Sequence, residues 1–340
     1  MSITNKPVIA VIGATGAVGE ALFSIIAERM GTDLQVHAIA SKKSFGKTVH
    51  FGRKELGVEV LDSFDFAAVD FAFFSAGARI SRKFAPKAVA AGCIVIDNTS
   101  AFRYQDKYPL VVPEINPEQL DSVKPGSIIA NPNCSTIQLV MAIAPIHWAA
   151  GVDRINVATY QSVSGAGRAG MEELAKQTMA KLQFGEVKPV AFRQQIAFNV
   201  LPEIDSMEDN GYTREEMKLQ WETCKILNDP NVRVNATAVR VPVFFGHSEA
   251  VHLETREDIS IEEVAALLKK APGISVQEDV NKGFASAVTH AAGKDDVFVS
   301  RLRRDHTHKR GINLWVVSDN VRKGAALNAI QIMEAIQKRA

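Results

Sequence analysis

Short apolar runs alternate with amphipathic stretches over the first 150 residues of the chain. Residues 8–12 are apolar throughout and lie between Pro7 and Gly13, as expected of a strand buried on both faces. Further runs predict strands at 34–40, 70–74, 93–96 and 128–130, and helical periodicity covers 17–30 and 80–91. Strands that alternate with helices predict an α/β fold built on a doubly wound parallel sheet.

The pattern changes after about residue 150. Longer strands are expected at 154–163, 232–243 and 249–254, shorter ones at 297–299 and 314–317, and helices at 170–182, 213–227 and 261–270. This combination of longer strands and separate helices predicts an α+β domain with an antiparallel or mixed sheet. The final stretch, 321–339, is an amphipathic helix that we expect to pack back on the first domain. The predicted division is therefore residues 1–132, completed by 320–340, and residues 133–319.

Composition narrows the class of protein. A net charge of +1, with no dense Lys/Arg tract, argues against a nucleic-acid binder. The 3 cysteines form no CxxC pair and no metal-ligand spacing with histidine, so neither a disulfide framework nor a metal site is expected. The start of the chain leaves no room for a signal peptide, and no apolar run is long enough to span a membrane. We expect a cytoplasmic enzyme or binding protein.

A glycine-rich turn follows the first predicted strand. Gly13, Gly16 and Gly19 form a GxxGxxG pattern, with Thr15, Ala17 and Val18 between them. The pattern alone is weak, but it ends a strand and opens a helix, where backbone N–H groups can hold a pyrophosphate. A plain strand-to-helix turn that needs glycine for packing is the alternative.

The end of the second predicted strand indicates which dinucleotide is bound. NAD-binding sheets often carry an acidic residue there, for the ribose 2′-hydroxyl. This chain has Ser41, Lys42 and Lys43 instead, and a hydroxyl with an ammonium group suits a 2′-phosphate. The sequence therefore favours NADP, the alternative being a solvated basic turn.

Cys134 is the candidate nucleophile. It follows Asn131-Pro132-Asn133 and precedes a run with helical periodicity, so its thiol is expected at a helix N-terminus, which favours the thiolate. The side chain of Asn133 and nearby amides can donate to an oxyanion. Most lone cysteines are inert core residues, and we expect Cys93 and Cys224 to be of that kind.

Further candidate groups lie in the second half of the chain. Residues 161–167 (QSVSGAG) end a strand in a small turn that can approach a nicotinamide. A plain loop that connects the strand to the next helix is an equally good interpretation of this segment. Arg240 offers a fork for a carboxylate, and His247 can transfer a proton near neutral pH. Glu215 and Lys218 are three residues apart on a predicted helix and share a face, as many surface pairs do.

In combination, these motifs resemble those of the aspartate-β-semialdehyde dehydrogenase family. The motifs are GATGAVG at 13–19, NPNCST at 131–136, QSVSGAG at 161–167, RVPV at 240–243 and GH at 246–247, and NTSAFR at 98–103 and DNVRKGAA at 319–326 also fit. The resemblance runs from residue 8 to the final helix, and no catalytic position departs from it. Residues 281–310 carry no recognisable motif.

The resemblance implies a Rossmann-type domain, a homodimer and a reaction. Cys134 would form the acyl thioester, His247 would be the acid/base and Gln161 would orient the substrate. Arg240 would bind the α-carboxylate and Glu215 the α-ammonium. Arg103 and Lys218 would hold phosphate.

The same resemblance implies NADP as the cofactor, and we expect Ser164, Gly165 and Asn320 to join the glycine loop in binding it. The substrate would be aspartyl phosphate or aspartate semialdehyde, on the route to lysine, methionine and threonine. Two alternatives stay open: the related N-acetyl-γ-glutamyl-phosphate reductase, and a non-catalytic dinucleotide-binding protein of the same fold.

Overall fold

The computed structural model describes residues 6–279, 281 and 283–339. It divides into two compact units. The N-terminal unit comprises the residues up to Asn133 together with those from Ala325 onward, and the central unit runs from Cys134 to Gly324.

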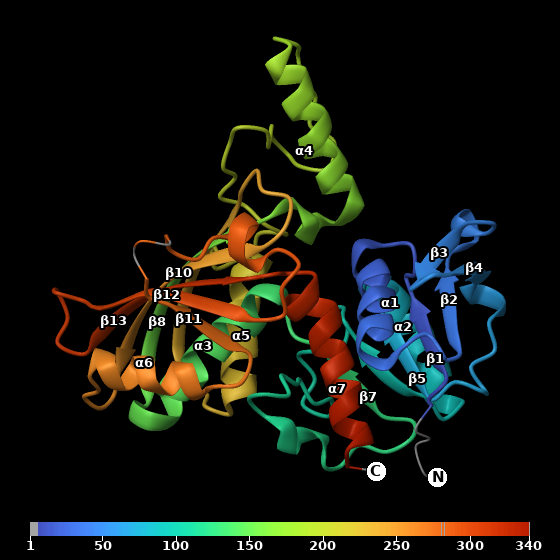
Figure 1. The fold of residues 1–340 in the computed structure, drawn as a ribbon, viewed down its shortest axis with the longest axis horizontal. Coiled ribbons are helices and arrows are strands. Elements are labelled where there is room, and N and C mark those ends of the chain that lie inside the picture. Colours follow the sequence, from blue (N-terminus) through green and yellow to red (C-terminus); the bar gives the residue numbers. More distant parts are fainter. Residues whose placement is uncertain (1–5, 280, 282, 340) are drawn as a thin grey trace. The chain divides into compact units, whose positions relative to one another are not determined.

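A seven-stranded sheet forms the centre of the N-terminal unit, in the order β3-β4-β2-β1-β5-β6-β7 (Figure 1). All neighbouring strands are parallel except β3 and β4. The strands are β1 (Ile9–Ile12), β2 (Val36–Ala40), β3 (Thr48–Phe51), β4 (Lys54–Val60), β5 (Phe71–Phe74), β6 (Ile94–Asp97) and β7 (Ile128–Ala130). The strand order changes direction at β1, where a doubly wound sheet leaves a crevice for a ligand. The predicted parallel sheet is confirmed.

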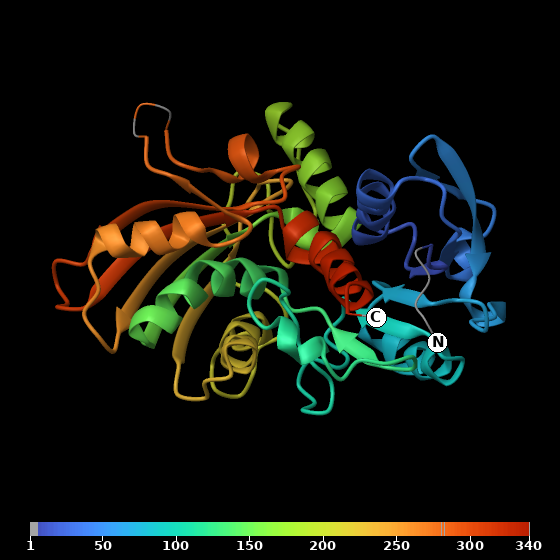
Figure 2. The same ribbon diagram turned by 60° about the horizontal axis from the view of Figure 1, so that its bottom comes forward.

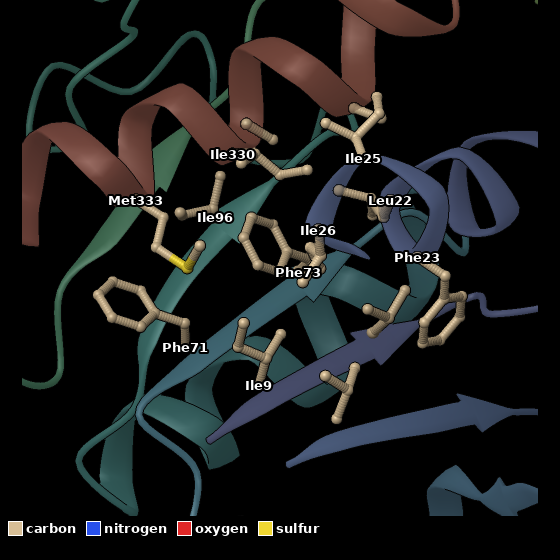
Figure 3. Close-up of a cluster of buried hydrophobic side chains, with 14 of the residues drawn as sticks. Ile9, Leu22, Phe23, Ile25, Ile26, Phe71, Phe73, Ile96, Ile330 and Met333 are labelled. Carbon is tan, nitrogen blue, oxygen red and sulfur yellow. The ribbon is translucent and has the colours of Figure 1, made fainter. Parts of the chain in front are cut away.

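In the described part of this unit the α-helices are α1 (Ala17–Met30), α2 (Ala78–Ala90) and α7 (Leu327–Gln337). The apolar side of α7 packs against the sheet, with Ile330 and Met333 beside Phe71 and Phe73 in one buried cluster (Figure 3). The end of the chain therefore contributes to the same hydrophobic core as its first strands.

The C-terminal helix is shorter than the periodicity of residues 321–339 predicts. A π-helical turn, η7 (Arg322–Ala326), precedes α7. A Cβ atom at Gly324 would lie 2.9 Å from Cβ of Cys134, so glycine is required there by close packing. The chain also passes from the central unit to the N-terminal unit directly after Gly324. Local packing at this crossing therefore replaces the first turns of the expected α-helix.

The central unit contains a six-stranded mixed sheet in the order β11-β12-β13-β10-β8-β9. Two neighbouring pairs, β8 with β9 and β11 with β12, are parallel and the others are antiparallel. The strands are β8 (Val152–Gln161), β9 (Arg233–Arg240), β10 (His247–Thr255), β11 (Ile274–Gln277), β12 (Val297–Arg304) and β13 (Gly311–Ser318). This confirms the mixed sheet expected for the second half of the chain.

Helices α3 (Cys134–Ala150), α5 (Arg214–Leu227) and α6 (Ile261–Lys270) pack on this sheet (Figure 2). Helix α4 (Gly167–Leu182) follows the 3-10 turn η4 (Val163–Ala166) and projects away from the sheet (Figure 1). Residues 281–310, which carry no motif, supply a π-helical turn, η6 (Ala287–Ala291), and strand β12. Among the described residues, no helix is long and apolar enough to cross a membrane.

The two faces of the central sheet differ in burial. Thr159, Gln161, His247 and Glu249 alternate with residues of the other face and are all buried. On that other face, the Tyr160 ring lies 5.6 Å from the Trp315 ring, and Tyr160 is 37% exposed. The buried face thus carries polar side chains at one end of the sheet, beside the first residues of α3.

Candidate active site

Cys134 is the first residue of α3, as the sequence predicts. The unpaired N–H groups of a first helical turn favour a negative charge at that place. The Cys134 side chain is partly exposed, whereas the following residues of α3 are buried. Arg240 lies close enough to interact electrostatically with Cys134. The thiol therefore stands in an electropositive and accessible environment, which suits a nucleophile.

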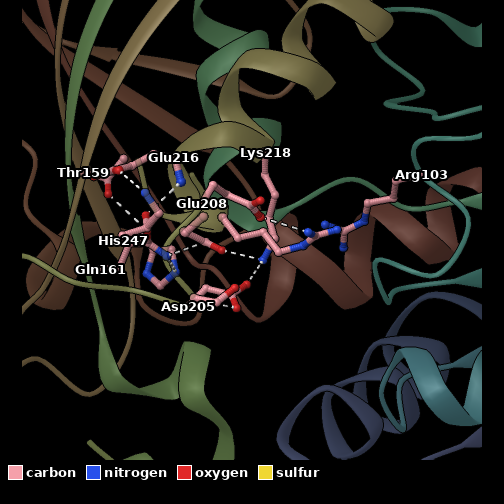
Figure 4. A network of polar contacts seen from close by, with 12 residues as sticks. Arg103, Thr159, Gln161, Asp205, Glu208, Glu216, Lys218 and His247 are labelled. Atoms are coloured by element: carbon pink, nitrogen blue, oxygen red, sulfur yellow. Dashed lines mark hydrogen bonds and ion pairs between the residues drawn. The ribbon is translucent and has the colours of Figure 1, made fainter. Parts of the chain in front are cut away.

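Gln161 and His247 lie at neighbouring ends of β8 and β10 and are both buried. The Gln161 amide nitrogen donates to Oε1 of Glu215 at 3.0 Å and lies 3.4 Å from Nε2 of His247 (Figure 4). Both side chains come from residues that the sequence selected. The two strand ends thus bring an amide and an imidazole to one place.

The hydrogen bonds of His247 fix its tautomer. Its Nδ1 atom accepts from the backbone N–H of Ser162 at 3.1 Å. A ring nitrogen that accepts in this way carries no proton, so the neutral ring holds its proton on Nε2. Burial, with the nearby Arg240 guanidinium, lowers the pKa of His247 to about 3, although Glu215 opposes this. Near neutral pH, His247 therefore presents an Nε2–H donor to the site.

Glu215 links the amide to the half-buried ammonium group of Lys218. Its Oε2 atom lies 2.8 Å from Nζ of Lys218, which is also 2.8 Å from Oδ2 of Asp205 (Figure 4). The i, i+3 spacing on α5 brings Glu215 and Lys218 together, as the sequence predicts. Burial alone would lower the pKa of Lys218, but the two carboxylates outweigh it and raise that pKa. Lys218 is consequently a firmly charged cation.

Arg240 ends β9 and is buried, with Nη1 donating to the backbone oxygen of Ser162 at 2.8 Å. Burial lowers its pKa, and Glu215 and Cys134 offset part of that effect. A cavity of about 230 Å³ reaches Arg240 and is also lined by Asp205 and Ile204. A guanidinium beside such a cavity can bind a carboxylate with two parallel hydrogen bonds.

The turn η4 packs closely on these groups. A Cβ atom at Gly165 would lie 2.8 Å from Nη1 of Arg240 and 3.4 Å from Nε2 of His247, so a larger residue would displace the Arg240 guanidinium. The Asn320 side-chain oxygen accepts from Ser162 Oγ, Ser164 Oγ and the backbone N–H of Gly246. Asn320 and Ser164, which the sequence assigns to the cofactor, therefore hold the loop beside His247 in place.

A separate cavity of about 680 Å³ lies within the N-terminal unit, at the carboxyl ends of the strands. Gly13, Thr15 and Gly16 line one side of it. Gly13 has a φ of +97°, and a Cβ atom there would lie 2.7 Å from Ser75 Oγ. A Cβ atom at Gly19 would lie 2.3 Å from the carbonyl oxygen of Gly13, so this glycine permits close packing of α1. The loop has the geometry that a dinucleotide pyrophosphate requires.

The lining of this cavity also includes hydroxyl and cationic groups. Ser41 and Ser44 line it, and Ser44 Oγ lies 3.3 Å from Thr15 Oγ1. Lys42, in the 3-10 turn η1 (Lys42–Ser44), is exposed and is not among the lining residues. Arg79 and Lys83 of α2 do line the cavity. The sequence did not select them because a helix that begins at Ala78, far from the end of the second strand at Ala40, gives no local indication of facing the cavity.

Arg103 and Asn133 belong to the N-terminal unit. Arg103 Nη2 donates to the backbone oxygen of Asn98 at 2.8 Å, within the loop that follows β6. Asn133 directly precedes Cys134 and is buried. Their assigned roles stay predictions.

The other two cysteines differ from Cys134. Burial raises the pKa of Cys93 to about 11 and also raises the pKa of Cys224. Both are therefore poor nucleophiles. Within the described part of the chain, no group of three or more His, Cys, Asp or Glu side chains is placed to hold a metal ion.

Comparison with known proteins agrees with this site. Residues 8–123 match the family described as semialdehyde dehydrogenase, NAD binding domain, and residues 143–323 match semialdehyde dehydrogenase, dimerisation domain. The aspartate-semialdehyde dehydrogenase of Legionella pneumophila is 53% identical over 331 residues, which cover 97% of this chain and 95% of that protein. The chain belongs to the aspartate-semialdehyde dehydrogenase family.

Solved structures of the family have the same fold. Aspartate semialdehyde dehydrogenase II of Vibrio cholerae, complexed with ASA, superposes with a TM-score of 0.96 at 51% identity and covers 98% of this chain and 99% of its own. The Candida albicans enzyme, solved with NADP, has a TM-score of 0.76 at 25% identity and covers 98% of this chain and 99% of its own. Membership of the aspartate-semialdehyde dehydrogenase family confirms the predicted oxidoreductase and favours it over N-acetyl-γ-glutamyl-phosphate reductase and over a non-catalytic protein.

Proposed function

We propose that this chain catalyses the reversible NADPH-dependent reductive dephosphorylation of L-aspartyl-4-phosphate to L-aspartate-4-semialdehyde, in the biosynthesis of lysine, methionine and threonine. The observation that carries the proposal is the constellation in the central unit. A thiol at a helix N-terminus stands with a buried arginine, an acid, an amide and a neutral histidine.

The reaction begins with Cys134. Its thiolate attacks the acyl carbon, the C–O bond to phosphate breaks, and a thioester forms on the sulfur. Lys218 and Arg103 stabilise the departing phosphate with their positive charges. Bound NADPH supplies the hydride that reduces the thioester. The resulting thiohemiacetal oxyanion collapses to the aldehyde and returns the thiolate.

The proton and the oxyanion are handled by neighbouring donors. His247 is the acid/base of the cycle. Because its Nδ1 atom accepts from the backbone N–H of Ser162, the ring begins the cycle with its proton on Nε2. Gln161 orients the acyl group through its amide nitrogen, and Asn133 donates from the residue before Cys134. Donors fixed before the reaction stabilise charge as it develops without having to reorganise.

Two charged groups select the substrate. Arg240 binds the α-carboxylate as a bidentate partner, and Glu215 binds the α-ammonium. An acetylated, one-carbon-longer substrate lacks the ammonium charge and would leave the buried Glu215 facing a neutral amide. The site therefore favours aspartate semialdehyde over N-acetylglutamate semialdehyde.

NADP is the proposed cofactor. The backbone of the turn at Gly13, Thr15 and Gly16, with the start of α1 at Ala17 and Val18, would hold the pyrophosphate. Ser41, with Lys42 beside it, would hold the 2′-phosphate. Ser164, Gly165 and Asn320 would shape the site near the nicotinamide.

The proposed assembly is a homodimer in the cytoplasm. The face of the central sheet opposite α3 exposes part of Tyr160, and residues 143–323 match a dimerisation domain. All three cysteines are free thiols, and a nucleophilic Cys134 must stay reduced to work.

The test is an assay of phosphate-dependent NADP reduction with L-aspartate semialdehyde. We expect turnover that requires phosphate and is lost in Cys134→Ala, whose circular dichroism should match the parent protein. N-acetylglutamate semialdehyde should give a kcat/KM at least a hundredfold lower, because the buried Glu215 would lose its charged partner. A higher kcat/KM for the acetylated compound would assign the chain to the related reductase instead.

A further inference from the structure

Thr159 is a buried residue that contacts Gln161 of the candidate active site. It is on β8 two residues before Gln161, so both side chains point to the same face of the sheet. Thr159 is fully buried, and its Oγ1 atom donates to Oε1 of Gln161 at 3.1 Å (Figure 4). The hydroxyl thus contacts the oxygen end of the Gln161 amide.

The orientation of the Gln161 amide depends on this bond. Its nitrogen donates to the Glu215 carboxylate and its oxygen accepts from Thr159. A flipped amide would place its oxygen against a carboxylate oxygen, which repels it. Thr159 and Glu215 therefore hold the amide from opposite ends, with its nitrogen toward the Glu215 carboxylate.

One of these two restraints is shared with the substrate. Under the proposed function, Glu215 binds the substrate ammonium, and its carboxylate then divides its hydrogen bonds between that ammonium, Lys218 and Gln161. The bond from Thr159 is not shared in this way. We propose that Thr159 is a positioning residue for the reaction, whose hydroxyl keeps Gln161 aligned while substrate occupies Glu215. This inference rests on the proposed function.

Thr159→Val tests the inference because valine keeps the shape of threonine and removes the hydroxyl. In the phosphate-dependent assay, we expect kcat to fall about tenfold, the effect of one lost hydrogen bond, with KM for aspartate semialdehyde within about twofold. Thr159→Ser keeps the hydroxyl and should restore most of the activity. The matched control is Thr255→Val, at the other end of β10, where a buried hydroxyl donates to the Glu257 backbone oxygen at 2.7 Å. It should lower Tm and leave kcat unchanged.

A double variant separates positioning from a general structural effect. If Thr159 acts through Gln161, then adding Thr159→Val to Gln161→Ala should cause no further loss of kcat. Parental kcat in Thr159→Val, or the same tenfold loss in the Gln161→Ala background, would overturn the inference. Failure of the proposed function would look different, because the parent protein and Thr255→Val would then show no phosphate-dependent turnover.

Discussion

Glu249 shows how strongly burial in the central unit changes the ionisation of a carboxyl group. It is fully buried on β10, two residues after His247, and its neighbour on α3 is Gln138. Burial raises the pKa of Glu249 well above the ordinary 4.5, and the Gln138 side chain offsets only part of that effect. The carboxyl group therefore stays protonated in the folded protein at pH values where it ionises in the unfolded chain.

This raised pKa gives a pH dependence of stability. The folded state holds the Glu249 proton more tightly, so its stabilising effect is fully present below pH 4.5 and is lost as the pH rises toward the folded pKa. Glu249→Gln stays neutral at every pH. We expect its Tm, relative to the parent protein, to increase between pH 5 and pH 8.

The control for that measurement is Glu257→Gln, an exposed position with no such burial. Its Tm difference from the parent protein should be the same at both pH values. A Glu249→Gln difference that is equally independent of pH would contradict a neutral buried acid.

We expect the cofactor preference to depend on the residues that directly follow β2, Ser41 first among them. Ser41 lines the cavity of the N-terminal unit. Ser41→Asp places a carboxylate beside the expected 2′-phosphate, so kcat/KM for NADP should fall at least tenfold while that for NAD falls less or rises. Steady-state kinetics with both cofactors measure this. Equal losses for the two cofactors would remove Ser41 from the 2′-phosphate site.

At the scale of elements, hydrophobic periodicity predicted those helices and strands that bury one face against the rest of the protein. The expected helix at 261–270 coincides with α6, and Thr213 caps α5 in a reciprocal capping box with Glu216. Strands β3 and β4 were missed because both expose many residues, and β4 carries four charged or glycine positions in KELGVEV. Strands at or next to an exposed edge of a sheet show little apolar pattern in the sequence.

The site residues also divide into those that the local sequence marks and those that only the tertiary fold brings to the site. Cys134, Gln161 and His247 could be selected because a motif or strand end marks each of them. Thr159 gave no comparable indication, although its i−2 spacing from Gln161 on a strand places the two on one face. Arg79 and Lys83 face the nucleotide cavity only because α2 packs against β5 and β6. Such groups follow from the tertiary fold.

The π-helical turn η7 gives a prediction at this scale. Its Gly324 packs so closely on the first residue of α3 that a Cβ atom would lie 2.9 Å from Cβ of Cys134. Gly324→Ala should displace the nucleophile and lower kcat about a hundredfold or more, because small displacements of reacting groups are costly. Gly57→Ala is the control, since a Cβ atom there meets no atom within 4 Å. Parental kcat in Gly324→Ala would show that this contact does not fix Cys134.

At the scale of the whole molecule, the N-terminal unit depends on two distant parts of the chain. Helix α7 and the turn before it contribute Ile330, Met333 and further side chains to a core whose other members come from before Asn133 (Figure 3). The Ile330 and Met333 side chains are fully buried. The dinucleotide-binding unit is therefore complete only when the end of the chain has packed.

Ile330→Ala tests this dependence. Removing a fully buried isoleucine side chain should lower the free energy of unfolding by about 2–5 kcal/mol. Thermal unfolding followed by circular dichroism measures the change, with the exposed Lys338→Ala as control. An unchanged Tm in Ile330→Ala would mean that α7 adds little to this core.

A thioester on Cys134 is tested most directly by a reaction without phosphate. Under those conditions aspartate semialdehyde and NADP should yield a burst of about one NADPH per site, because the thiolate adds to the aldehyde and hydride transfer leaves an acyl-enzyme with no phosphate to release it. Mass spectrometry of the quenched protein should then find the mass of an aspartyl group on the peptide that contains Cys134. The burst and the added mass should both be absent in Cys134→Ala. A burst without this adduct, or an adduct on Cys93 or Cys224, would contradict the mechanism.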